Sequence, residues 1–156
     1  MDDFETPAIA YLRQHEIPFT VFRHAGPVQS LEQAAQERHQ RPEQVIRSIL
    51  FRLGQNQFVM VLIPGPDQVP WKPLRKYLRQ SRVTMATEEE VLQVTGCIPG
   101  TVNPFTLLNS IRILVDRAIL DLPEVSIGSC QRGLAIILTP AALLSALHEY
   151  EVVDFS

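Results

Sequence analysis

Apolar residues near the start of the chain recur at helical spacing in two segments, and each segment follows a residue that caps helices well. The Thr-Pro pair at 6–7 predicts the start of a helix that ends near His15. Ser30 and Gln33 have the spacing of a capping box, which predicts a second helix. A strand over 19–23 is expected between the two helices.

Further along the chain, runs of β-branched and apolar residues predict strands. Residues 45–53 and 58–63 flank a short turn and predict an antiparallel hairpin. Strands that follow one another directly outnumber strand-helix-strand units, so we expect an α+β fold. It would be a single domain over residues 1–156, with a curved, mixed, mostly antiparallel sheet surrounded by helices. The other expected elements are a helix over 70–80, a strand over 83–86, a helix over 87–94, strands over 111–115, 124–127 and 134–138, and a helix over 139–148.

The segment 96–104 is too irregular for a helix or a strand, because it contains two glycines and two prolines. Glycines let backbone N–H groups approach a ligand closely, as an oxyanion or carboxylate site requires. Segments of this composition are also common as ordinary turns. The pattern alone leaves both interpretations open.

An arginine interrupts the apolar pattern of the predicted strand 45–53. Because side chains alternate between the two faces of a strand, Arg47 shares a face with Ile49 and Phe51. A guanidinium in such surroundings needs acceptors, which a carboxylate, carbonyl groups or a ligand can provide. Arg47 is therefore either a structural cation at the end of a strand or a cation at the mouth of a cavity.

Charge is unevenly distributed along the chain, although the formal net charge is only -3. A negative total argues against a protein that coats nucleic acid indiscriminately. No acidic residue occurs between Asp67 and Glu88, and four basic residues in this stretch recur at helical spacing. The pattern indicates either a contact with a phosphate backbone or a solvated helix face. The four residues are Lys72, Arg75, Lys76 and Arg79.

The two cysteines, Cys97 and Cys130, lie far apart in the sequence, and neither has a closely spaced histidine. We therefore expect two reduced thiols, no disulfide and no metal site, as in a cytoplasmic protein. A thiol nucleophile at Cys97 with His24 as its base is a weaker alternative. The longest apolar run, residues 58–63, is far shorter than a membrane span, and the acidic start of the chain lacks the basic residues of a signal peptide. These features predict a protein of the cytoplasm that does not contact a membrane.

The order and spacing of several segments resemble the YbaK family, whose domain also occurs as the editing insertion of bacterial prolyl-tRNA synthetases. The resemblance covers nearly the whole chain. The segments that carry it are Thr6-Pro7-Ala8, His24-Ala25-Gly26-Pro27, 30–35, 45–50, 94–104, Asp116 and 128–134, the last of which contains Arg132-Gly133-Leu134.

The resemblance implies hydrolysis of the ester of a mischarged aminoacyl-tRNA, without a cofactor, by a curved mixed sheet ringed by helices. It places the family's functional lysine at Arg47, where a guanidinium excludes any role that needs a neutral amine. It also implies that Gly100 and nearby loop amides stabilise the oxyanion. Two further positions depart from the family: Asn103 replaces a frequent serine, and Ala135 replaces a frequent aspartate. The residues expected to bind the substrate are Gly96, Thr101, Asn103, Pro104 and His24.

Three functions therefore remain open, of which a trans-acting aminoacyl-tRNA deacylase agrees best with the resemblance. A catalytically silent protein that keeps the pocket for an aminoacyl or nucleotide ligand is the second, and a thiol hydrolase is the third. The expected partner is the acceptor end of an aminoacyl-tRNA, with the basic helix as the candidate phosphate contact and a tRNA synthetase as an open second partner. The sequence does not indicate which amino acid or tRNA is recognised, or the oligomeric state.

Overall fold

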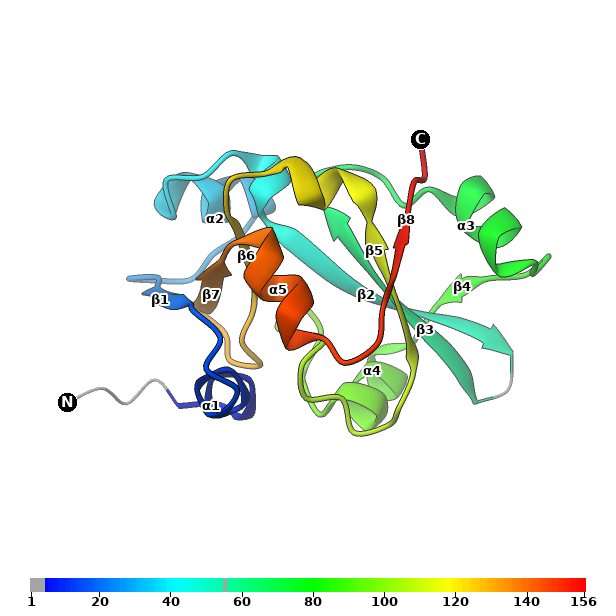
Figure 1. Ribbon diagram of the computed structural model, residues 1–156, viewed down its shortest axis with the longest axis horizontal. Coiled ribbons are helices and arrows are strands. Elements are labelled where there is room, and N and C mark those ends of the chain that lie inside the picture. The colour runs from blue at the N-terminus through cyan, green and yellow to red at the C-terminus, as the bar shows by residue number, and fades with distance from the viewer. Residues whose placement is uncertain (1–4, 55) are drawn as a thin grey trace.

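The computed structural model, which describes residues 5–54 and 56–156, contains two β-sheets with helices arranged around them (Figure 1). The helices are α1 (Pro7–Gln14), α2 (Leu31–Glu37), α3 (Trp71–Leu78), α4 (Glu88–Thr95) and α5 (Pro140–Ala146). The strands are β1 (Thr20–Arg23), β2 (Ile46–Gly54), β3 (Gln57–Pro64), β4 (Thr84–Met85), β5 (Arg112–Asp116), β6 (Val125–Gly128), β7 (Leu134–Leu138) and β8 (Glu151–Val153). Two short 3₁₀ helices are η1 (Pro42–Gln44) and η2 (Arg117–Asp121).

Four of the helices have a serine or threonine at the N-cap position. Each of these side chains accepts a hydrogen bond from a backbone N–H of the first turn, which has no partner inside the helix. At α4 the cap is reciprocal, since Glu90 also accepts from the backbone N–H of Thr87. The four capping residues are Thr6, Ser30, Thr87 and Thr139.

The smaller sheet has the antiparallel order β1-β7-β6, and the larger sheet has the order β4-β2-β3-β5-β8. In the larger sheet β2 is antiparallel to β3 and β4, whereas β3-β5 and β5-β8 are parallel pairs. One edge of β2 pairs with β3 from Ile46 to Gly54, with a register shift between Arg52 and Gly54. The other edge pairs with β4 only at Phe51 and Arg52, and an isolated bridge joins Val45 to Ser126 of β6. The two sheets separate between these points.

The β2–β3 hairpin divides the apolar interior into two clusters. On one face, Leu50 and Leu62 belong to a cluster that also contains Val102 and Phe105 of the segment after α4. On the other face, Phe51, Val61 and Ile63 pack with Leu74 and Leu78 of α3. The segment after α4 and helix α3 therefore pack on opposite faces of the hairpin.

The α+β fold and the central hairpin are confirmed. The single curved sheet expected from the sequence is instead two sheets that share the first apolar cluster. Strand β8 was missed because it has only three residues, too few to show a periodic pattern. The last helix ends at Ala146, two residues before the predicted end.

Glu151 joins three elements at the outer edge of the larger sheet. Arg112 of β5 donates from Nε at 2.5 Å and from Nη2 at 2.8 Å to the two Glu151 oxygens, and the Tyr77 hydroxyl of α3 donates at 2.6 Å. The hydrogen bonds from Arg112, assisted by that from Tyr77, lower the pKa of Glu151 from 4.5 to about 2. The Glu151 carboxylate therefore links β8 to β5 and α3 through hydrogen bonds.

We predict that Glu151→Gln destabilises the fold in a pH-dependent way. Because folding depresses the pKa of Glu151, its stabilisation is complete above pH 4.5 and is lost as the pH falls toward about 2. For a pair this exposed, the loss at neutral pH is about 1 kcal/mol or less. Urea unfolding at several pH values measures it. Glu149→Gln, on the exposed turn before β8, is the control; equal curves for the two variants would contradict the prediction.

Candidate functional site

A cavity of about 1110 Å³ lies along the unpaired part of the edge of β2, where the two sheets separate. Its walls come from residues 46–50 of β2, from α2, from residues 99–102 after α4, and from the turn 131–134 before β7. Small-molecule sites commonly measure about 300–1,000 Å³, so this cavity is large enough for such a ligand.

The segment after α4 forms its wall by packing closely on β6. A Cβ atom on Gly128 would lie 2.6 Å from the carbonyl oxygen of Thr101 and 2.5 Å from that of Val102, so only glycine permits this approach. The N–H of Cys130 also donates to the Thr101 carbonyl at 2.7 Å. Gly100 has a φ of +88° and open space where a Cβ would lie. Its backbone is therefore accessible at the cavity wall.

Arg47 lines the same cavity as Gly100 and Thr101, as the alternation argument allowed. Its Nη2 donates to the backbone carbonyl of Asp67, whereas its buried Nε has no hydrogen-bond partner. Burial lowers the pKa of Arg47, and the nearby charge of Asp67 partly offsets this. The buried hydroxyl of Ser48, the next residue in β2, also lacks a partner. Both residues line the cavity, but the unpartnered Nε and hydroxyl oxygen are themselves buried.

His24 also lines the cavity, but both of its ring nitrogens are engaged. Nδ1 lies 2.5 Å from Oε1 of Glu37, and Nε2 accepts a hydrogen bond from Nε of Arg38 at 3.0 Å. Because Nε2 is an acceptor, the proton of the neutral ring is on Nδ1 and is donated to Glu37. Hydrogen bonds from Gln33 and then from His24 lower the pKa of Glu37. His24 therefore orients Arg38, a cavity residue that sequence reasoning missed.

The helical spacing of the sequence could have identified Arg38 as a candidate site residue. It follows Ala34 by four residues and Ala35 by three, so it extends the buried face of α2, where a charge needs a partner or a ligand.

The other predicted site residues lie elsewhere in the described structure. Gly96 ends α4 with a φ of +75°, and Pro104 follows Asn103 in the buried part of the loop. The side-chain oxygen of Asn103 accepts from the N–H groups of Phe105 and Thr106, which fixes a turn. These three do not line the cavity. Nor do the four basic residues, of which Lys72, Arg75 and Lys76 lie in α3 and Arg79 is its C-cap; α3 packs on the opposite face of the hairpin.

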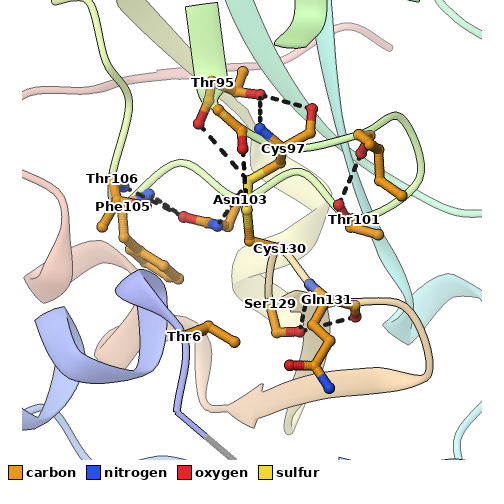
Figure 2. Close-up of a disulfide and its surroundings, with 12 residues drawn as sticks. Thr6, Thr95, Cys97, Thr101, Asn103, Phe105, Thr106, Ser129, Cys130 and Gln131 are labelled. Carbon is orange, nitrogen blue, oxygen red and sulfur yellow. Dashed lines mark hydrogen bonds between the residues drawn. A yellow bond between two sulfur atoms is a disulfide. The ribbon is translucent and has the colours of Figure 1, made fainter.

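The expectation of two reduced thiols is wrong: Cys97 and Cys130 form a disulfide with a Cα–Cα distance of 5.1 Å (Figure 2). Folding brings together two loops that are 33 residues apart in sequence, and sequence spacing alone does not reveal that contact. The bond joins the segment after α4 to the turn before β7, and each cysteine lies within two residues of a residue that lines the cavity. It also removes the free thiol that a Cys97 hydrolase requires, so that alternative is wrong as well.

Metal-binding clusters and membrane-spanning helices are both absent from residues 5–54 and 56–156. No group of three or more histidine, cysteine or acidic side chains is placed to hold a metal ion in that part of the chain. None of its helices combines the length and apolar character needed to cross a membrane.

Comparison with known proteins decides the family. Residues 25–146 match the model of the aminoacyl-tRNA editing domain. The chain belongs to this family. The resemblance noted from the sequence is therefore confirmed.

Relatives and solved structures agree with this assignment. The chain is 31% identical over 106 residues to a proline–tRNA ligase of Kosmotoga olearia, covering 68% of this chain and 18% of the relative. It is 34% identical over 91 residues to that of Streptococcus thermophilus, covering 58% and 14%. The chain thus spans less than a fifth of the length of these relatives. A structure described as that of a proposed trans-editing enzyme for prolyl tRNA synthetase has the same fold, with a TM-score of 0.82, 21% identity, and coverage of 96% of this chain and 97% of that one.

We predict that the disulfide stabilises this editing domain by about 3–4 kcal/mol, because it closes a long loop in the unfolded chain. The double variant Cys97→Ala/Cys130→Ala should lose that amount in urea unfolding. Wild type in a dithiol reductant should lose nearly as much, which separates loss of the bond from the effect of the alanines. Equal unfolding free energies for oxidised and reduced wild type would contradict the prediction.

Proposed function

We propose that the chain is an aminoacyl-tRNA deacylase that hydrolyses the ester of mischarged tRNA in trans. The observation that carries this proposal is a single cavity lined by both the Arg47 cation and the glycine-containing loop 99–102. Ester hydrolysis develops negative charge on the carbonyl oxygen, and a fixed cation with backbone N–H groups stabilises such charge. Family membership and the fold support the same reaction.

In the proposed reaction, water attacks the carbonyl carbon of the ester and forms a tetrahedral intermediate. The N–H of Gly100 and the Arg47 guanidinium stabilise its oxyanion. The bond to the ribose oxygen then breaks, that oxygen gains a proton, and free amino acid and tRNA are released. Arg47 cannot serve as a base because a guanidinium keeps its proton. His24 is engaged at both nitrogens. We therefore assign activation of the water to the neighbouring ribose hydroxyl of the substrate.

The remaining predicted residues take supporting roles in this proposal. Thr101 and His24 line the cavity and are therefore placed to contact a ligand inside it. Gly96, Asn103 and Pro104 shape the loop that carries Gly100. No cofactor is needed. The partner is the acceptor end of a tRNA, a tRNA synthetase stays an open second partner, and the cytoplasm, where tRNA is charged, is the proposed location.

A catalytically silent binding protein is the second candidate function. The contacts of Arg47 are the observation that supports it. The guanidinium that replaces the family's lysine is held by the Asp67 carbonyl, outside the loop that carries Gly100. A cation fixed in that way can hold a ligand without following the charge that develops on its ester. In this case the pocket binds the aminoacyl end of tRNA and does not turn it over.

We expect Arg47→Ala to lower deacylation on the order of 10²- to 10³-fold, because it removes one preorganised donor. Arg47→Lys should keep or raise activity, since it restores the family's residue. The measurement is release of amino acid from a panel of mischarged tRNAs, with thermal melts alongside. Arg52→Ala, an arginine of the same strand that does not line the cavity, is the control.

Three other outcomes of this experiment would each contradict a part of the proposal. Equal rates for wild type and Arg47→Ala would remove the role assigned to this residue. A lower melting temperature of Arg47→Ala would show a structural cation. Activity that appears only in Arg47→Lys would favour the silent binding protein.

The basic residues of α3 and its C-cap Arg79 are the proposed contact for the phosphate backbone of tRNA. Replacing Lys72, Arg75, Lys76 and Arg79 by Glu should weaken tRNA binding and flatten its salt dependence, because each phosphate contact releases counterions. Lys76→Glu can be compared with Arg117→Glu, an exposed charge of η2. If all variants bind tRNA with the affinity and salt slope of wild type, these residues form only a solvent-exposed helix face and do not contact tRNA.

A further inference from the structure

The cavity carries an excess of positive charge in a chain whose formal net charge is -3. Four arginines line it, whereas Glu88 is the one carboxylate among its described lining residues. The arginines come from separate elements: β1, the end of α2, β2 and the turn before β7. Folding therefore gathers cations that the sequence scatters. They are Arg23, Arg38, Arg47 and Arg132.

Arg38 is the most firmly positioned of these cations. Its Nε donates to Nε2 of His24 at 3.0 Å, and its Nη1 donates to the hydroxyl of Ser126 at 2.8 Å. Ser126 in turn donates to Oε1 of Gln40 at 2.7 Å, so the hydroxyl is fixed as an acceptor for Arg38. The guanidinium is thus oriented on two sides before any ligand arrives.

Both acceptors of Arg38 are neutral. In the described part of the chain no carboxylate comes within ion-pair distance of Arg38; Glu37 instead pairs with His24, and Glu124 bonds to Gln40. Burial lowers the pKa of Arg38, and Glu37 offsets this only in part. A partly buried guanidinium held by neutral groups retains donors on Nη2 and Nη1, and an anion is the partner that balances its charge.

We infer that Arg38 and Arg132 bind a nucleotide phosphate in this cavity, namely the 5′-phosphate of the terminal adenosine of an aminoacyl-tRNA. A guanidinium suits this group because its planar fork donates two parallel hydrogen bonds to phosphate oxygens. Arg132 is exposed on the turn before β7 and supplies a second cation at the same cavity. The identity of the nucleotide rests on the proposed function, whereas the phosphate site itself rests on the arginines.

The inferred phosphate site assigns two separate roles to the cavity: binding of the phosphate and hydrolysis of the ester. In an aminoacylated adenosine, the ester is on the 2′ or 3′ oxygen and the phosphate on the 5′ oxygen of one ribose. Anchoring the phosphate at Arg38 and Arg132 orients the ester for the Arg47 and Gly100 wall. Arg38 and Arg132 are thus positioning residues, distinct from the groups assigned to the oxyanion.

Two adenosine substrates that differ only in the phosphate test the inference. We expect wild type to hydrolyse 3′-aminoacyl-AMP with a kcat/KM roughly 10- to 100-fold above that of 3′-aminoacyl-adenosine, chiefly through a lower KM. In Arg38→Gln and Arg132→Gln this preference should fall toward one. Arg52→Gln, which alters an arginine outside the cavity, should keep it. A merely structural role of Arg38 would lower both rates and leave their ratio unchanged, which would overturn the inference.

Calorimetric binding of AMP and adenosine separates this inference from the proposed function. If wild type hydrolyses neither substrate, deacylation fails, yet AMP should still bind more tightly than adenosine. That difference should disappear in Arg38→Gln and in Arg132→Gln. Equal binding of the two ligands by wild type, or no binding of AMP, would overturn the phosphate site. Arg132→Gln keeps the test valid if Arg38→Gln folds poorly, because Arg132 is exposed. Tight AMP binding with no preference between the two substrates would indicate a site for free nucleotides and overturn the assignment to tRNA.

Discussion

The incomplete pairing of β2 is the constraint on which the candidate site depends. Its edge away from β3 meets β4 only at Phe51 and Arg52 and meets β6 through a single bridge at Val45. A closed ladder would have used the intervening edge for strand pairing. Because the two sheets separate there, the side chains and backbone of residues 46–50 line a cavity. The fold thus makes its site from a part of the sheet that no neighbouring strand covers.

Two constraints fix the position of the loop after α4 beside the cavity. Gly128 lets the loop after α4 approach β6 so closely that a single added Cβ would collide with two carbonyl groups. The Cys97–Cys130 disulfide then ties this loop to the turn before β7 (Figure 2). Both constraints act on the two walls that carry Gly100 and Arg132. A rigid wall is what electrostatic stabilisation needs, since donors that must first reorganise lose most of their effect.

Local signals explain which parts of the fold could be predicted. The Ser30 N-cap of α2, the capping box of α4 and the β2–β3 hairpin involve residues a few positions apart, so these elements could be predicted from the sequence. At α2 the predicted capping box is not reciprocal, because the Gln33 side chain accepts from the N–H of Gln29. The disulfide, the division into two sheets and the arginine cluster depend on contacts between distant segments. Alternation correctly marked Arg47 as a costly charge, but it could not indicate that Asp67 would supply the acceptor. The sequence indicates Arg38 more weakly, as a charged residue on the buried face of α2.

Arginine in place of lysine is consistent with a cavity that works through fixed charge. A lysine can lose its proton when buried, whereas a guanidinium keeps its proton, and apart from His24 the basic residues that line this cavity are all arginines. Proton transfer by these residues is thereby excluded, and His24 is committed to Glu37 and Arg38. What such a site can do is attract an anionic ligand, orient it and stabilise charge that develops on it. In the proposed deacylation, the chemistry of bond cleavage therefore comes from water and from the substrate's own hydroxyl, and the proposed role of the arginines is to hold the ligand accurately.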